Sequence, residues 1–207
     1  MFKLKNLFSL GITVGHQFFF STPMLDFFYL GVVSNRDFSF TLYKLKEILF
    51  SLLILRNFLI SALKRRKFTF FLIFSKWNQY LVVSALFDSF FSKKQALKNK
   101  ILVYFMLTPQ VGFLSSMSQR AISFQEDVDL PRNISFSNII VVSFGDAVLP
   151  IVVHEVASKR GIVIGIVDSN QVKVWSHVDY IVSGNDDSLA VAYFFGLFIL
   201  NVLFSFR

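Results

Sequence analysis

The chain has 207 residues, a length that suits a single domain with a sizeable core. It has no cysteine, which excludes disulfides, thiolate metal sites and cysteine nucleophiles. The net charge is +8, but residues 1–107 carry fifteen basic and four acidic side chains, whereas residues 108–207 carry six basic and nine acidic ones. This asymmetry favours one polyanion-binding face, with an ordinary solvated surface as the alternative.

The first part of the chain, residues 1–40, is expected to hold a short helix and a polar loop. Residues 1–10 carry two lysines followed by apolar residues, and they predict an amphipathic helix that ends near Gly11. Residues 11–17 read Gly-Ile-Thr-Val-Gly-His-Gln, in which His16 taken alone would be a hydrogen-bonded structural histidine more often than a catalyst. The turn-forming residues Ser-Asn-Arg-Asp at 34–37 separate two apolar runs.

Residues 41–107 alternate between helix and strand patterns, and a basic cluster follows each predicted helix. The predicted elements are a helix over 41–63, a strand over 68–74, a helix over 77–91 and a strand over 101–107. In the first helix, Arg56 and Asn57 interrupt the apolar run and argue against a membrane span. The cations after the helices are candidates for phosphate contacts, with solubilising loops as the alternative. They are Lys64, Arg65, Arg66 and Lys67 after the first helix, and Lys93, Lys94, Lys98 and Lys100 after the second.

Residues 138–207 predict a parallel α/β sheet. The runs at 138–144 and 162–167 are apolar and of strand length, and a helical segment over 150–160 joins them. Strand, helix and strand in this order form a βαβ unit, whose strands lie parallel and buried on both faces. A short third strand over 179–183 leads into a final helix. The preceding residues 108–137 lack a regular pattern and are interpreted as an irregular or reduced insertion.

Polar residues stand just past the ends of two of these strands, where open α/β sheets present their functional surface. Asp168, Ser169 and Asn170 follow one strand, and Gly184, Asn185, Asp186 and Asp187 follow the other. The three aspartates would suit Mg²⁺, which makes a magnesium-dependent α/β enzyme one hypothesis. Against it, the chain has none of the glycine-rich motifs that cradle phosphates and no Gly-x-Ser-x-Gly motif.

The final helix, expected over residues 189–206, is apolar all round and about 27 Å long. An integral membrane protein anchored by this helix is therefore a further alternative. Gly196 and Asn201 weaken that interpretation, and we expect the helix to pack against the sheet instead.

Four segments of the chain resemble, in order, the small-subunit ribosomal protein two family. Residues 11–17 match its Gly-x-x-x-Gly-His-Gln segment, and residues 154–162 read His-Glu-Val-Ala-Ser-Lys-Arg-Gly-Ile, similar to its Glu-Ala-x-x-x-Gly-Ile segment. Val-Asp-Ser-Asn at 167–170 is similar to the Asp-Thr-Asn strand end of the family, and Ser-Gly-Asn-Asp-Asp at 183–187 to its Ile-Pro-Gly-Asn-Asp-Asp loop. After Gln17 the family continues with basic residues and Trp-Asn-Pro, of which this chain keeps only Pro23.

The resemblance implies one ribosomal-protein domain over 1–207 with a flavodoxin-like parallel sheet flanked by helices. Its parts would be 1–40, 41–107, 108–137 with a reduced or absent helical hairpin, and 138–207. The resemblance also implies a structural, non-enzymatic role without cofactor or metal, in contact with small-subunit rRNA and neighbouring ribosomal proteins. The two basic clusters, His16, Gln17, Asn35 and Arg36 are the expected RNA-binding residues, and the family-motif loops contain Gly11, Gly15 and the seven polar-loop residues at 168–170 and 184–187.

A mitochondrial ribosome is the expected location. The chain contains 28 phenylalanines, more than packing requires, and phenylalanine and lysine codons can be built from A and T alone. A strongly AT-biased genome, as organelles often have, would explain this composition. The association favours an organelle-encoded protein.

Overall fold

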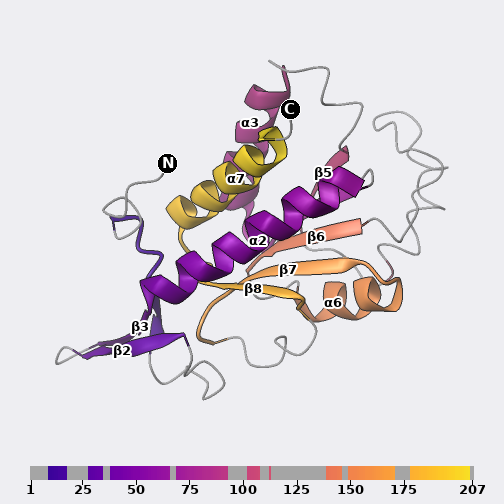
Figure 1. Ribbon diagram of the computed structural model, residues 1–207. Coiled ribbons are helices and arrows are strands. Elements are labelled where there is room, and N and C mark those ends of the chain that lie inside the picture. The colour runs from indigo at the N-terminus through magenta and orange to yellow at the C-terminus, as the bar shows by residue number, and fades with distance from the viewer. Residues whose placement is uncertain are drawn as a thin grey trace.

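The computed structural model describes residues 9–17, 28–34, 38–65, 69–92, 102–107, 112, 139–145, 149–170 and 178–205. Within these residues, a five-stranded parallel sheet occupies the centre of the fold (Figure 1). Its strands are β4 (Thr69–Phe74), β5 (Leu102–Leu107), β6 (Ile139–Phe144), β7 (Ile162–Val167) and β8 (Tyr180–Ser183). Their spatial order is β5-β4-β6-β7-β8, which is the 2-1-3-4-5 order of flavodoxin-like sheets. The predicted α/β fold class is confirmed.

The strands lie where continuous apolar runs predict them, because both faces of this sheet are covered. Every residue of β4 and of β6 is buried. The two strands pair without a register shift, from Thr69 opposite Ile139 to Phe74 opposite Phe144. A run without polar alternation is the pattern of a strand buried on both faces.

Helices cover the two faces of the sheet unequally (Figure 1). The helices α2 (Leu45–Arg65), α3 (Trp77–Ser92) and α7 (Leu189–Phe204) share one apolar core with alternate strand residues such as Phe70, Leu72 and Phe74. The intervening residues Phe71 and Ile73 belong to a second core on the opposite face, together with side chains of α6 (Leu149–Ser158). The period of two along β4 therefore divides its side chains between two cores.

The final helix packs inside the protein, as the sequence predicted. Nine of its sixteen residues are buried, and it contacts both α2 and α3. A Cβ atom at Gly196 would lie 3.1 Å from Cγ1 of Val83, so this glycine allows α3 and α7 to approach closely. In the described part of the chain, no helix combines the length and apolar character needed to cross a membrane.

A small antiparallel sheet precedes the central one and corrects two expectations. It consists of β1 (Val14–Gln17), β2 (Tyr29–Ser34) and β3 (Ser39–Tyr43), in the order β1-β3-β2. The motif expected as a loop at 11–17 thus ends in a strand. The helix predicted from residue 41 begins only at Leu45, because Thr41 and Tyr43 are strand residues whose side chains are buried on one face.

Several predictions fall on residues outside the described part of the chain. These are most of the first helix at 1–10, the turn residues 35–37, the lysine cluster at 93–100 and nearly all of the insertion at 108–137. The reduced or absent helical hairpin therefore remains a prediction.

Candidate functional site

The candidate site lies at the carboxyl-terminal edge of the central sheet, where the antiparallel sheet meets it. Asp168 follows the last residue of β7 and is fully buried. The loop 184–187 follows the neighbouring strand β8 and leads into α7. Parallel strands end at the same edge, so the two loops are adjacent.

Asp168 is the centre of this site, because groups from four different segments bind its carboxylate. Its Oδ1 accepts hydrogen bonds from the backbone N–H of His16 at 3.1 Å and from the Tyr43 hydroxyl at 2.8 Å. It also accepts one from the backbone N–H of Ser169. Its Oδ2 accepts the Asp186 N–H at 3.3 Å and lies 3.1 Å from Nδ1 of His16. The two loops are therefore held by hydrogen bonds within the protein.

The structure explains why a glycine precedes His16. A Cβ atom at Gly15 would lie 2.4 Å from Oγ1 of Thr41 and 2.9 Å from both Oδ1 of Asp168 and the Tyr43 hydroxyl. Distances below 3.0 Å leave no room for a side chain, so only glycine fits between β3 and Asp168. The Gly-His pair therefore brings the His16 backbone against the buried carboxylate.

A second carboxylate binds the other side of the His16 ring. Nε2 of His16 lies 3.2 Å from Oδ2 of Asp187, and the Lys76 ammonium pairs with Oδ1 of the same aspartate. Side-chain exposure is 26% for His16 and 51% for Asp187, so this end of the site is open to water. The charged groups alternate in sign from Lys76 through Asp187 and His16 to Asp168.

The loop before α7 is held by the side chain of Asn185 and by Gln79 on α3. Asn185 Oδ1 accepts the N–H groups of Asp187 and Ser188, and the Ser188 hydroxyl caps the helix by accepting the Val191 N–H. The buried side chain of Gln79 donates to the Asp186 carbonyl at 2.6 Å. The final helix thus begins at a polar cap, Ser188.

Electrostatics in the site favour a protonated His16 and an ionised Asp168. The hydrogen bond to Asp168 and the charges of Asp168, Asp186 and Asp187 raise the pKa of His16 to about 9, although burial opposes the rise. Burial favours the neutral form of Asp168, but the bonds from His16, Ser169 and Tyr43 outweigh it and lower its pKa. Burial and the Asp168 charge raise the pKa of Tyr43, so its hydroxyl stays a donor at neutral pH.

The groups available to a metal ion differ from those that the sequence suggested. His16, Asp186 and Asp187 each offer one ligand atom, and these atoms lie within 4.8 Å of one another. Asp168, which was expected in this set, binds His16 and Tyr43 instead. A cation here would have to displace both the proton of His16 and the ammonium of Lys76.

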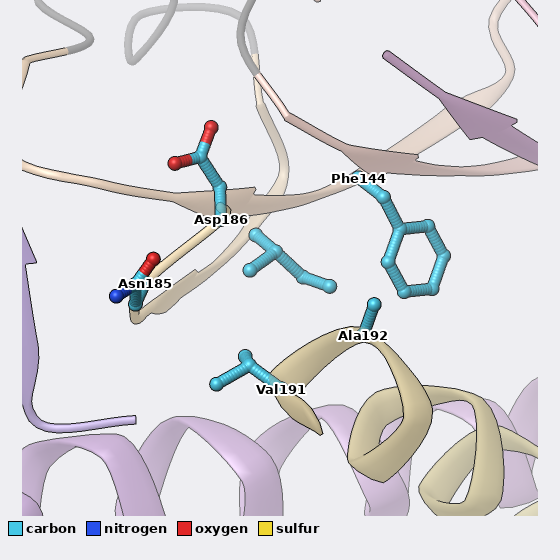
Figure 2. Close-up of a pocket in the computed structure, with 6 residues that line it drawn as sticks. Phe144, Asn185, Asp186, Val191 and Ala192 are labelled. Atoms are coloured by element: carbon cyan, nitrogen blue, oxygen red, sulfur yellow. The ribbon is translucent and has the colours of Figure 1, made fainter. Parts of the chain in front are cut away.

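A small gap, too narrow for a water molecule, lies beside the polar cluster (Figure 2). It is lined by Phe144, Ile166, Asn185, Asp186, Val191 and Ala192. Figure 2 shows the Asp186 carboxylate directed away from Val191 and Ala192 on α7.

The structure brings most of the family-motif residues together and separates them from the described residues of the basic cluster at 64–67. Gly11 has a positive φ of 71° and its carbonyl accepts the Val14 N–H, which turns the chain into β1. Gly15, His16, Ser169 and Asp186 adjoin the Asp168 carboxylate, and Asp187 reaches it through His16. Gln17, Asn170, Gly184 and Asn185 are their neighbours along the chain. Lys64 and Arg65 instead end α2, shortly before β4 starts at the amino-terminal edge. Asn35, Arg36, Arg66, Lys67, Lys93, Lys94, Lys98 and Lys100 lie outside the described residues.

Sequence reasoning missed part of the site and part of the basic edge. Thr41, Tyr43, Lys76 and Gln79 contact the motif residues, and only the alternation over 39–43 could have indicated the first two. Lys159 and Arg160 are exposed in the turn between α6 and β7, which also lies at the amino-terminal edge. The order of helix and strand in the sequence is enough to predict that Lys159 and Arg160 lie at the amino-terminal edge.

No protein-family model and no curated protein matches this chain.

Proposed function

We propose that the chain is a structural protein of the small ribosomal subunit of mitochondria, and that it binds rRNA and neighbouring ribosomal proteins. One observation carries the proposal. Three segments that resemble the small-subunit ribosomal protein two family, at 11–17, 168–170 and 184–187, meet around the Asp168 carboxylate. The loops at 168–170 and 184–187 are neighbours because β7 pairs with β8, so the informative contact is the one that residues 11–17, on a separate sheet, make with Asp168.

In this proposal, the polar cluster anchors the amino-terminal sheet and does not itself bind RNA. His16 is held between Asp168 and Asp187, and the carboxylate of Asp186 lies nearby. These negative charges would repel a phosphate. The earlier expectation that His16 contacts RNA is therefore replaced, within the proposal, by a positioning role.

The rRNA contacts are assigned to cations at the amino-terminal edge of the sheet. Lys64 is exposed at the end of α2, before β4, and Lys159 and Arg160 are exposed before β7. Only β6 separates β4 from β7, so the starts of these strands lie roughly 10 Å apart. Cations at this spacing suit neighbouring phosphates, and binding by charge and shape needs no catalytic step.

Sedimentation of the tagged, full-length protein tests the proposal. We expect it to travel with small-subunit rRNA in a sucrose gradient, to stay there after a wash at raised potassium chloride, and to separate from the large subunit when magnesium is removed. A protein that remains at the top of the gradient at low salt would contradict the proposal. So would retention in the lipid pellet after carbonate extraction and ribosome dissociation.

A further inference from the structure

The helix α2 has an apolar stripe on the side that faces away from the sheet. Phe50, Leu53 and Ile54 are 56%, 52% and 42% exposed. The positions 46, 50, 53, 54 and 57 follow the i, i+4, i+7, i+8, i+11 spacing of one helix face. In Figure 1, α2 lies across the front of the sheet, and none of the other helices and strands that the structure describes lies in front of it.

The opposite side of α2 already fills the core. Ile48, Leu52, Leu55 and Leu59 are buried there, and the helix contacts β8 and α7. A helix that is apolar on both sides normally has both sides covered. The outer stripe therefore indicates a second partner surface.

The charges beside the stripe indicate the chemistry of that partner. Lys46 begins the stripe, and Arg56 lies next to Leu53 on one flank; both are exposed, and no ion pair joins either of them to another described residue. The acidic residue of the helix, Glu47, is partly buried and lies on the other flank of the stripe, about 100° from Lys46 and next to Ile54. Two unpaired cations beside an apolar stripe are complementary to a surface that is both apolar and acidic.

We propose that this stripe binds an amphipathic helix of a neighbouring protein, whose apolar face covers Phe50, Leu53 and Ile54 and whose acidic residues pair with Lys46 and Arg56. Side chains at i, i+3 and i+4 form ridges that pack into the grooves of a second helix. The assignment of that neighbour to the ribosome rests on the proposed function, whereas the surface itself does not.

Two other classes of partner fit the stripe less well. RNA is bound through its phosphates, and burying Phe50, Leu53 and Ile54 contributes nothing to phosphate contacts. A membrane-surface helix has a continuous apolar face. Here Asn57 and Ser61, both exposed, continue the stripe and interrupt its apolar character after one and a half turns.

Site-specific photo-crosslinking in the intact assembly tests the inference. The photoreactive amino acid p-benzoylphenylalanine replaces Phe50 or Leu53 in the full chain, and Asp88, which is exposed on α3, is the control position. We expect positions 50 and 53 to crosslink to one helical segment with acidic residues in another protein, and position 88 not to reach that segment. Crosslinks to RNA, lipid, this same chain or a second copy, or none above the control, would overturn the inference.

Charge substitutions give a second measurement. The variants Leu53→Glu and Lys46→Glu change exposed side chains, so both should unfold like the original protein. Each should reduce the crosslink yield from position 50 by about tenfold or more, if the residue is central to the interface. An unchanged yield in both variants would overturn the inference.

The same gradients separate the two proposals. A protein that sediments with the small subunit but crosslinks only to RNA from position 50 would contradict the helix partner and leave the ribosomal function standing. Crosslinks to an acidic helix in fractions without ribosomal RNA would support the helix partner and contradict the ribosomal function.

Discussion

His16 and Asp168 meet at two points although 152 residues separate them. The backbone N–H of His16 donates to Oδ1 of Asp168 at 3.1 Å, and its ring Nδ1 lies 3.1 Å from Oδ2. One residue thus engages both oxygens of a fully buried carboxylate. This pairing connects the amino-terminal sheet to the central one.

The first prediction concerns the glycine beside this pair. Gly15→Ala should destabilise the protein by at least about 2 kcal/mol, because the new Cβ would press on Thr41, Asp168 and Tyr43 and separate their polar groups. Gly31→Ala is the matched control, since it lies in β2 with no atom within 4 Å of its Cβ position, and it should stay within about 0.5 kcal/mol. Urea unfolding of both variants measures the difference. Equal stability of the two would mean that Gly15 is not sterically required.

The second prediction is that His16 makes stability fall at alkaline pH. The folded-state pKa of about 9 lies above the ordinary 6.5, so the contribution is complete below pH 6.5 and is lost as pH rises towards 9. The rise corresponds to about 3 kcal/mol. The pKa of Asp168 is lowered from 3.8, so the pair also weakens in strong acid, where this carboxylate is protonated. The pair therefore contributes fully between pH 3.8 and pH 6.5, the ordinary pKa values of Asp168 and His16.

Denaturant unfolding from pH 6 to 9.5 checks this dependence, with His16→Gln as the comparison. The variant has no group that titrates at this position. The difference in unfolding free energy between the two proteins should therefore be largest near pH 6 and should shrink by about 3 kcal/mol on the way to pH 9. Parallel curves for the two proteins would contradict the pairing.

The third prediction isolates the Tyr43 hydroxyl. Tyr43→Phe removes a 2.8 Å hydrogen bond to a buried carboxylate, and it should cost about 1.5–3 kcal/mol. Tyr193→Phe removes a hydroxyl from a tyrosine that is 41% exposed on α7, and it should change stability by less than about 0.5 kcal/mol. Thermal unfolding distinguishes the two, and a neutral Tyr43→Phe variant would show that Asp168 does not depend on this donor.

The fourth prediction tests the proposed rRNA contacts. Replacing Lys64, Arg65, Arg66 and Lys67 together by Gln should weaken incorporation into the small subunit without unfolding the domain. Each lost phosphate contact should lower the slope of log affinity against log salt by about one, and the whole cluster by up to about four. Lys76→Gln removes a cation from the opposite edge and should leave the slope unchanged. If the quadruple variant keeps its slope, the cluster is only a solvated turn.

The central sheet could be predicted from the sequence because its signals are local. Runs such as 162–167 are apolar throughout, and such a run is a strand buried on both faces wherever it lies. The final helix was harder, since an apolar helix suits a membrane as well as a core. Gly196 supports packing in the core only when its position is known, because a Cβ atom there would lie 3.1 Å from Val83 on α3.

The antiparallel sheet and the site could not be predicted in the same way. Thr41 and Tyr43 continue directly into α2, so their strand pattern is short and merges with a helical one. Their hydroxyls bond Ser169 and Asp168, both more than 120 residues later. The motifs identified the residues that matter, but only the fold shows that they surround one carboxylate.

The distance between His16 and Asp168 along the chain also has a consequence for synthesis. Translation delivers the amino-terminal residues first, so His16, Thr41 and Tyr43 leave the ribosome long before Asp168 and Asp187 exist. The contacts of α2 with β8 and α7 are equally late. Contacts between distant residues form slowly because their loops must close first. The antiparallel sheet of β1, β2 and β3 therefore reaches its final place only after almost the whole chain has been made, which leaves its strands accessible to chaperones throughout elongation.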